Sequence, residues 1–354
     1  MSTSGQVVKW TPGERRVFRL IRQRPGISRV ELAEVAGLST GTVTQIVKRL
    51  RQDGLADEGE IIESRGMGRS RIGLKPQADP DRVVGISVRP DLIRYVLADW
   101  SGAVREERTI ACHTFADQSA VIDRIGQSLA SAKTGVCALG LATPGFPVSA
   151  REHAEMWAEM LGGQLRVPTR VINNGVAAAI AEEWRWLKNP PADFLLVYFG
   201  SGIGGALVHR RRFGRVPAIH PVEVGHVGIA PDGERCICGN RGCVETVASP
   251  AARVRLGEVE EYWDQAQRAL MYALTSAINV LDVADVVLSG LRQPQLEQFY
   301  GTLSERLKVL NTPDGTPVTP RMSVLGDECA ALGAALAAMD GFAEAATHFR
   351  KGDE

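Results

Sequence analysis

The chain has 354 residues, of which 44% are hydrophobic and 23% are charged, a composition typical of a globular protein. A chain of this length is expected to form about two or three folding units. It contains no run of about eighteen apolar residues, so no membrane span is predicted. Lys and Arg number 41, as do Asp and Glu, but their distribution is uneven. Residues 1–76 hold 14 basic and 8 acidic side chains, a difference of +6, which leaves 27 against 33, or −6, elsewhere. The basic amino-terminal part is therefore the part expected to meet a polyanion.

Three helices are predicted near the amino terminus. The first begins at Thr11 and ends at the next proline and glycine pair. A second helix begins at Ser28, which forms a capping box with Glu31, and ends at Gly37, where the chain can turn sharply. Ser39 is a suitable cap for a third helix.

The third helix has one apolar stripe and one polar face. Val43, Ile46, Val47 and Leu50 form the stripe. Two helices joined by a glycine-containing turn are typical of a helix-turn-helix, whose second helix enters the DNA major groove. A structural helical hairpin with a solvated polar face is the alternative interpretation. If the module binds DNA, we expect contacts from Thr40, Gly41, Thr44, Gln45, Lys48 and Arg49.

A wing following the helices favours DNA binding over the plain helical hairpin. After Gly54, a charged turn and the Ile61-Ile62 pair predict a short hairpin, and a cationic strip follows from Arg65 to Arg71. Arg69 on this strip is suited to the narrow minor groove of A/T-rich DNA. The module is expected to cover residues 1–76, with a linker near 75–80.

The larger part of the chain alternates strands and helices. Residues 83–88 and 93–99 are predicted as strands, with a turn at Ser101-Gly102. A glycine-rich segment at 199–205 predicts another hairpin, which by its composition alone is only weak evidence of a phosphate site. The Asn173-Asn174 pair precedes a helix, so helix capping is one explanation of these amides and ligand binding is another.

Three cysteines and a histidine are concentrated within residues 223–245. Cys236, Cys238 and Cys243, with His226 upstream, match the ligand set of a closed, structural zinc site that leaves no position for catalytic water. The alternative is a set of buried or disulfide-bonded cysteines. The absence of a secretory signal and the scatter of the other cysteines favour zinc and a reducing cytoplasm.

The segment that runs from Glu223-x-Gly-His226 through Cys-x-Cys-Gly-x-x-Gly-Cys-x-Glu245 resembles the signature of the ROK family, which groups sugar kinases with sugar-responsive repressors. The resemblance implies zinc at the His and three Cys, and carboxylates of Glu223 and Glu245 in a monosaccharide pocket. Thr143-Pro144-Gly145 also resembles the family's turn beside the sugar. The family's repressors, unlike its kinases, carry a winged helix-turn-helix similar to residues 1–76.

Three positions differ from the pattern of the family's kinases. Their Asp-x-Gly-Gly-Thr phosphate loop is replaced at residues 87–91 by Ser-Val-Arg-Pro-Asp, in which proline lacks an N–H donor and fixes φ. Their catalytic Asp is replaced by Asn174, which cannot accept a proton but can still bind a hydroxyl. Their paired glycine near the adenine is replaced by Ser289-Gly290-Leu291. We therefore expect neither ATP binding nor enzymatic activity.

The resemblance implies an α/β fold in which the winged helix-turn-helix precedes a two-lobed, actin-like sugar-kinase (ribonuclease H-like) domain with a structural zinc site. The expected lobes are residues 77–172, joined by a returning helix at 330–350, and residues 173–329. A sugar between them would contact Gly145, Asn173, Asn174, Glu223, His226 and Glu245.

The predicted function is a cytoplasmic, sugar-responsive transcriptional regulator, most simply a repressor of carbohydrate uptake or catabolism genes. It would bind double-stranded operator DNA as a homodimer or a dimer of dimers, and a monosaccharide effector would change the spacing of its recognition helices. An active sugar kinase with an added DNA-binding arm is the competing hypothesis. A regulator whose effector is a partner protein or a phosphorylated sugar is a third.

Overall fold

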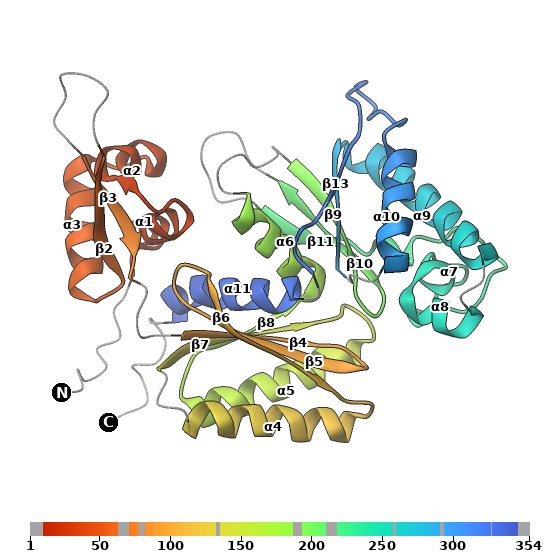
Figure 1. Cartoon of the computed structure of the whole chain (residues 1–354), viewed down its shortest axis with the longest axis horizontal. Coiled ribbons are helices and arrows are strands. Elements are labelled where there is room, and N and C mark those ends of the chain that lie inside the picture. The colour runs from red at the N-terminus through yellow and green to blue at the C-terminus, as the bar shows by residue number, and fades with distance from the viewer. Residues whose placement is uncertain are drawn as a thin grey trace.

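The structure, a computed structural model, describes residues 10–62, 71–77, 82–131, 135–186, 193–209, 218–257, 260–290, 294–326 and 328–345. It contains a small amino-terminal module and a larger body with two five-stranded sheets (Figure 1). Within the described ranges no helix combines the length and the apolar character needed to cross a bilayer.

The module consists of three helices and a three-stranded sheet of order β1-β3-β2. The predicted capping box at Ser28 is confirmed, and Thr11 forms a second one; each side chain accepts from the backbone N–H three residues later. Gly37 adopts the left-handed conformation (φ 63°) that the turn requires, and Ser39 caps the third helix. The elements are α1 (Pro12–Gln23), β1 (Ile27–Ser28), α2 (Arg29–Ala36), α3 (Thr40–Gln52), β2 (Ala56–Ile62) and β3 (Arg71–Pro76).

The predicted position of the wing hairpin is wrong. Residues 57–60, three of which are acidic, form no turn: they lie inside β2, which pairs antiparallel with β3 and has an irregularity between Glu58 and Ile61. Charge is tolerated there because β2 is an edge strand, and Glu58 accepts from Arg29 at 2.8 Å and from Arg51 at 2.9 Å. Residues 63–70, including Arg69, lie outside the described ranges. The predicted linker is also corrected, since residues 75 and 76 belong to β3.

The first sheet of the body has the order β6-β5-β4-β7-β8, with parallel pairing on the β7 side of β4 and antiparallel pairing on the β5 side. Helices α4 and α5 cover one face, and α11 lies on the other (Figure 1). The elements are β4 (Arg82–Val88), β5 (Leu92–Ala98), β6 (Val104–Ala111), α4 (Phe115–Ser131), β7 (Val136–Thr143), α5 (Val148–Leu165) and β8 (Thr169–Asn173).

The second sheet has the order β11-β10-β9-β12-β13, and its outer face packs on α9 and α10 in a separate apolar core. The elements are α6 (Asn174–Arg185), β9 (Asp193–Phe199), β10 (Ile203–His209), β11 (Ala218–Pro221), η1 (Val224–His226), α7 (Glu245–Ala248), α8 (Pro250–Leu256), α9 (Glu260–Leu281), β12 (Asp285–Gly290), α10 (Pro294–Leu307), β13 (Thr319–Met322) and α11 (Cys329–Ala345).

Helices α6 and α11 pack against each other between the two sheets, where small residues allow close backbone approach (Figure 1). A Cβ at Gly333 would collide with the carbonyl oxygen of Ala177 on α6, and a Cβ at Gly85 on β4 would collide with that of Ala331. These glycines let α11 contact both the first sheet and α6 directly. Any movement of α6 must therefore be accommodated by α11. The predicted continuation of this helix to residue 350 lies outside the described ranges.

Candidate functional site

A cavity of about 450 Å³ lies between the two lobes. The first lobe contributes the β4–β5 turn, the starts of α4 and α5, and the loop after β7; the second contributes the β9–β10 turn, η1 and the start of α7. Such a volume suits a small ligand such as a sugar. Five of the six residues predicted to bind sugar line it, namely Gly145, Asn174, Glu223, His226 and Glu245.

Two carboxylates face this cavity at close range. Glu245 accepts a 2.7 Å hydrogen bond from the backbone N–H of Ile203 in the β9–β10 turn. Burial raises the pKa of Glu245, the nearby charge of Glu223 raises it further, and the Ile203 N–H opposes both. Burial also raises the pKa of Glu223. The pair can accept several hydrogen bonds from a ligand rich in hydroxyl groups.

Two glycines make room for these carboxylates. A Cβ at Gly145 would overlap the Glu223 carboxylate and lie 3.2 Å from Nδ2 of Asn173, and a Cβ at Gly202 would overlap Glu245. Neither glycine has a positive φ, so close approach rather than backbone conformation explains them. The sequence pattern located Gly145 but gave no signal for Gly202 beyond a glycine-rich turn.

The two asparagines have different positions. Asn173 is the N-cap of α6, and its Oδ1 accepts from Val176 N at 3.1 Å, so the capping explanation is confirmed for this residue. It does not line the cavity, but its amide nitrogen is near Gly145. Asn174 does line the cavity, and its Oδ1 accepts from Gly175 N at 2.8 Å. That bond leaves the Asn174 NH₂ group as the donor available to a ligand.

The ligand atoms of His226, Cys236, Cys238 and Cys243 all lie within 4.8 Å of one another. The sulfurs of Cys238 and Cys243 are 3.7 Å apart, and His226 Nδ1 is 3.4 Å from the Cys236 sulfur. A disulfide needs about 2.05 Å between sulfurs, and none of the six cysteines, all of which lie in the described ranges, forms one. Tetrahedral ligands at about 2.3 Å from zinc lie about 3.8 Å apart, so the donor set fits a metal ion.

The loop that carries these cysteines is folded by glycines and backbone hydrogen bonds. Gly239 (φ 94°) and Gly242 (φ 60°) are both in the left-handed region, which confirms the predicted need for backbone freedom. A Cβ at Gly242 would also collide with the carbonyl of Ala230. Cys236 N donates to Asn240 O at 2.8 Å, which closes the turn between the cysteines.

His226 connects the cluster to the cavity. Its Nδ1 faces the cysteines, while its ring packs edge-on against Phe146 (4.7 Å between centroids) and lines the cavity. Burial lowers the pKa of His226, which favours the neutral imidazole that binds metals. With Nδ1 directed at the cluster, Nε2 is the nitrogen left to meet a ligand. The histidine was predicted in both roles, and its position is compatible with both.

The β4–β5 turn is closed by its own side chains. Arg89 N donates to Leu92 O at 2.9 Å, and the Arg89 guanidinium pairs with both oxygens of Asp91 at 3.1 and 3.0 Å. Gln118 on α4 donates to the Arg89 carbonyl at 2.9 Å. The turn contains no glycine, and Arg89, whose guanidinium is engaged by Asp91, lines the cavity.

Ser289 lies in the segment that stands where the family's kinases have a paired glycine near the adenine, and in this structure it contacts a buried carboxylate. Its hydroxyl donates to the buried carboxylate of Glu182 on α6 at 3.3 Å, and Ser323 donates to the same oxygen. Leu291 lies outside the described ranges.

Several cavity residues were missed by sequence reasoning. His113, Gln118, His153 and Trp157 lie on α4, on α5 or just before α4, and line the cavity. They occur in no motif, and only the packing of α4 and α5 on the first sheet directs them there. No signal in a single sequence would have identified them.

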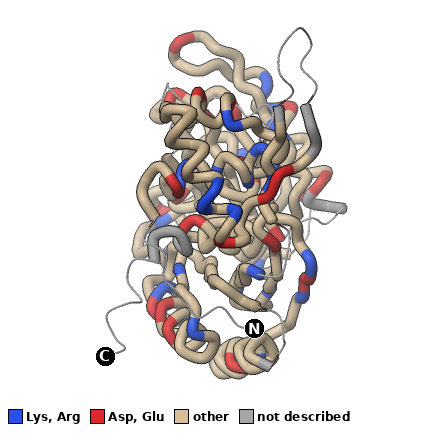
Figure 2. Tube along the Cα trace, turned by 90° about the vertical axis from the view of Figure 1, so that its left-hand side faces the viewer, with Lys and Arg blue, Asp and Glu red and all other residues tan. Residues whose placement is uncertain are grey.

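The polar face of α3 is exposed, as predicted. Val43, Ile46, Val47 and Leu50 are buried, and the exposed residues are Thr40, Gly41, Thr44, Gln45 and Lys48. Arg49 is only partly exposed, because its guanidinium donates to Glu14 on α1 at 2.6 Å. Figure 2 faces this side of the molecule and shows basic residues interspersed with acidic ones. A shallow groove along α3 and β2 is lined by Thr44, Lys48, Arg51, Gln52 and Arg29 among others.

Comparison with known proteins identifies two domains. Residues 84–258 match the ROK family, and residues 14–56 match a winged helix-turn-helix DNA-binding domain. The chain is 30% identical over 254 residues to the DNA-binding transcriptional dual regulator NagC of Escherichia coli K12. That similarity covers 67% of this chain and 62% of NagC, so less than two thirds of the relative's length is matched.

Two crystal structures show the same fold. A ROK family transcriptional regulator, described as a homolog of the E. coli MLC protein, matches with a TM-score of 0.66 at 21% identity and covers 94% of this chain and 97% of its own. A ROK family glucokinase from Streptomyces griseus, solved with glucose and AMPPNP, matches with a TM-score of 0.57 at 19% identity. It covers 73% of this chain and all of its own. At these identities the two structures establish the fold alone.

Proposed function

The chain is a member of the ROK family that carries a winged helix-turn-helix domain, and we propose that it is a sugar-responsive, DNA-binding transcriptional repressor that binds its sugar without phosphorylating it. One observation carries the proposal: the same chain has a cavity lined by two carboxylates and a helix-turn-helix whose polar α3 face is exposed. NagC, the relative with 30% identity, is a transcriptional regulator, which supports the assignment. We infer a working division into residues 1–76, 77–172 and 173–329.

The proposed sugar site uses groups that accept and donate hydrogen bonds. Glu223 and Glu245 would accept from sugar hydroxyls, and the Asn174 NH₂ group would donate to one. His226 would contribute Nε2, while Gly145 and Asn173 would allow Glu223 to approach the ligand. The two carboxylates are fixed by different elements, η1 and the start of α7, so their spacing can select one arrangement of hydroxyls over another.

We infer that the metal is zinc and that its role is structural. Three thiolates and one imidazole complete a tetrahedral set, and a bound ion would supply rigidity rather than an open coordination site. The cluster includes His226 at the end of η1, and Glu223 precedes that short helix. Holding the cluster together would therefore hold Glu223 at a fixed distance from Glu245.

The groups that would support phosphoryl transfer are replaced. The Arg89-Pro90-Asp91 turn offers no glycine-rich cradle for phosphates, and Asn174 cannot take a proton from a sugar hydroxyl. Ser289 is engaged with buried Glu182 instead of bordering a nucleotide. An active kinase with a DNA-binding arm is the second candidate, because the glucokinase has the same fold as the body.

For DNA, we propose that α3 enters the major groove. Gln45 would bond a base edge, Lys48 a base or phosphate, and Thr40, Gly41 and Thr44 would allow close approach. Arg49 would have to exchange Glu14 for a phosphate, so its contribution is expected to be smaller. A homodimer would present two α3 helices to paired half-sites, and such a regulator would act in the cytoplasm.

The deciding experiment measures binding and turnover on one preparation. Calorimetry with glucose, N-acetylglucosamine, xylose and their phosphates reports affinity, and a coupled assay with ATP reports phosphorylation. The proposal requires binding of at least one sugar and no sugar-dependent ATP turnover. Turnover at rates of about 1–100 s⁻¹ would establish the kinase instead.

A further inference from the structure

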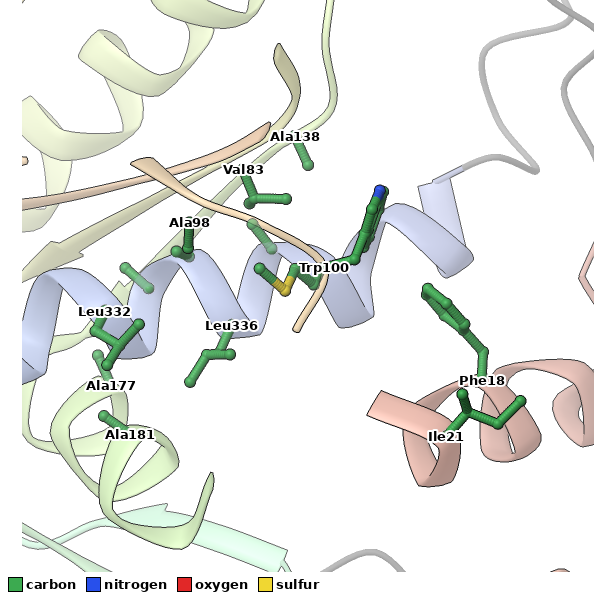
Figure 3. Packing of buried hydrophobic residues seen from close by; sticks show 14 of the residues in the cluster. Phe18, Ile21, Val83, Ala98, Trp100, Ala138, Ala177, Ala181, Leu332 and Leu336 are labelled. Atoms are coloured by element: carbon green, nitrogen blue, oxygen red, sulfur yellow. The ribbon is translucent and has the colours of Figure 1, made fainter. Parts of the chain in front are cut away.

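The amino-terminal module contacts the body through one face of α1. The ring of Phe18 lies between Trp10 (5.2 Å between centroids) and Trp100 of the body (5.5 Å), both edge-on. Figure 3 shows the Phe18 ring extending from α1 towards Trp100 and the end of α11, with Ile21 beside it on α1. Phe18 and Trp100 are almost fully buried, at 2% and 1% exposure, and the module and body share one apolar cluster. Helix α3 lies on the side of the module away from the body (Figure 1).

A buried cation lies at this contact. Arg22 of α1 is only 1% exposed, and its guanidinium carbon is 5.4 Å from the Phe18 ring centroid and 4.9 Å from that of Trp184. Its Nη1 pairs with Asp340 of α11 at 3.3 Å, and Arg19 pairs with the same carboxylate. Burial lowers the pKa of Arg22 to about 10, although Asp340 opposes the effect.

The charge of Arg22 is only partly compensated. Among the described residues, its Nε and Nη2 atoms are buried without a hydrogen-bond partner, and the carboxylate with which it pairs there, that of Asp340, is shared with Arg19. A buried cation with few hydrogen bonds contributes little net stability, and it depends strongly on the partners that remain. The contact is therefore well packed, but the charge of Arg22 is poorly compensated, so a small shift of Trp184 or Asp340 would change the stability of the contact.

Helix α6 connects this contact to the cavity. Trp184 lies in its last turn, whereas Asn173 and Asn174 lie at its first, and twelve residues of helix span about 18 Å. Trp184 is closely fitted, because a Cβ at Gly102 would lie 2.6 Å from its indole nitrogen. Since α6 also packs directly on α11, which carries Asp340, both partners of Arg22 belong to elements coupled to the cavity.

We propose that Arg22, Trp184 and Asp340 form a clasp between the DNA-binding module and the body, and that α6 couples the clasp to sugar binding. The inference rests on the proposed function, because the ligand is taken to contact the first turn of α6. Coupling between two sites is reciprocal, so docking of the module must alter sugar affinity by the same factor by which sugar alters docking. A variant that shifts the docking equilibrium therefore shifts the measured sugar affinity. The clasp can therefore be tested through the sugar.

Two clasp variants should shift sugar affinity in opposite directions. Asp340→Asn leaves Arg22 buried without its anion and loosens the clasp, whereas Arg22→Met removes the buried charge, keeps apolar contact with Trp184, and leaves Asp340 paired with Arg19. Each should change the dissociation constant about fivefold or more, as for ordinary coupled sites. Asp264→Asn, which breaks an exposed pair with Arg268 on α9, is the matched control and should leave affinity unchanged.

The assay is calorimetric titration of the full chain with whichever of glucose, N-acetylglucosamine or xylose binds the wild type. Hydrogen exchange of α1 in the wild type, with and without that sugar, provides a measurement that needs no variant and should show changed protection. If the sugar binds all variants equally and leaves α1 unchanged, the clasp is refuted while the proposed function stands. If no sugar binds the wild type, both are refuted.

Discussion

Replacing Gly145 by Ala should weaken sugar binding because it displaces the carboxylate of Glu223. The added Cβ would overlap the Glu223 carboxylate and lie 3.2 Å from Asn173 Nδ2, so Glu223 must move away from its position in the cavity. The carboxylate lies at the flexible end of the Glu223 side chain and can move without displacing the backbone. The free energy of unfolding should therefore change by less than about 1 kcal/mol. A misplaced carboxylate, however, loses a charged hydrogen bond worth about 1.5–3 kcal/mol.

That loss corresponds to a dissociation constant roughly 10- to 150-fold higher. Calorimetry measures the affinity, and thermal unfolding checks that the fold is intact. Gly163→Ala is the matched control, because a Cβ at this exposed position of α5 meets no atom within 4 Å and Ala favours the helix. If Gly145→Ala binds sugar as tightly as Gly163→Ala, Glu223 is not a ligand to the sugar and the proposed site is wrong.

Three other predictions concern the metal, the DNA and the chemistry. The purified protein should contain about one zinc per chain by elemental analysis, and Cys238→Ser should lose both metal and thermal stability; retention of both would contradict the cluster assignment. Gln45→Ala should reduce the free energy of binding to the cognate DNA site by about 1–3 kcal/mol and relax base preference there. Lys48→Ala should also reduce the salt dependence of binding. Footprinting that is unaffected by either change would exclude α3 from the interface. Asn174→Asp should not produce ATP turnover, because the Arg89-containing turn still lacks a phosphate cradle; a coupled assay that detects sugar-dependent turnover would show that Asn174 alone blocks catalysis.

Local patterns predicted local structure well. The capping box at Ser28, the left-handed Gly37 and the apolar stripe of α3 depend on residues three or four apart, so a single sequence contains all the information they need. The His and Cys cluster was predictable for a similar reason, since three of its four ligands lie within eight residues.

The wing was misplaced because strand pairing outweighs local composition. Residues 57–60, three acidic residues and a glycine, have the composition of a turn, but they lie on an edge strand, where charge is tolerated and Glu58 pairs with two arginines. The pairing partner of this strand begins at Arg71, beyond the cationic strip, and nothing in residues 57–62 indicates that partner.

Long-range contacts were not predictable from the sequence. Arg22 and Asp340 are separated by 318 residues, and each taken alone resembles an ordinary charged helix residue. The same is true of Gln118 and His153, which reach the cavity only because α4 and α5 pack on one face of the first sheet. Such contacts depend on the tertiary arrangement, about which periodicity and capping patterns carry no information.

The most direct test of the proposed function is the affinity of the full chain for a DNA site selected from random sequence, measured by fluorescence anisotropy across a titration of the bound sugar. We expect sugar to change the dissociation constant for DNA by about fivefold or more, as for other coupled sites, and Glu223→Gln to need more sugar for the same change. A DNA affinity that no sugar alters, in a protein that consumes ATP when sugar is added, would contradict the assignment as a sugar-responsive regulator.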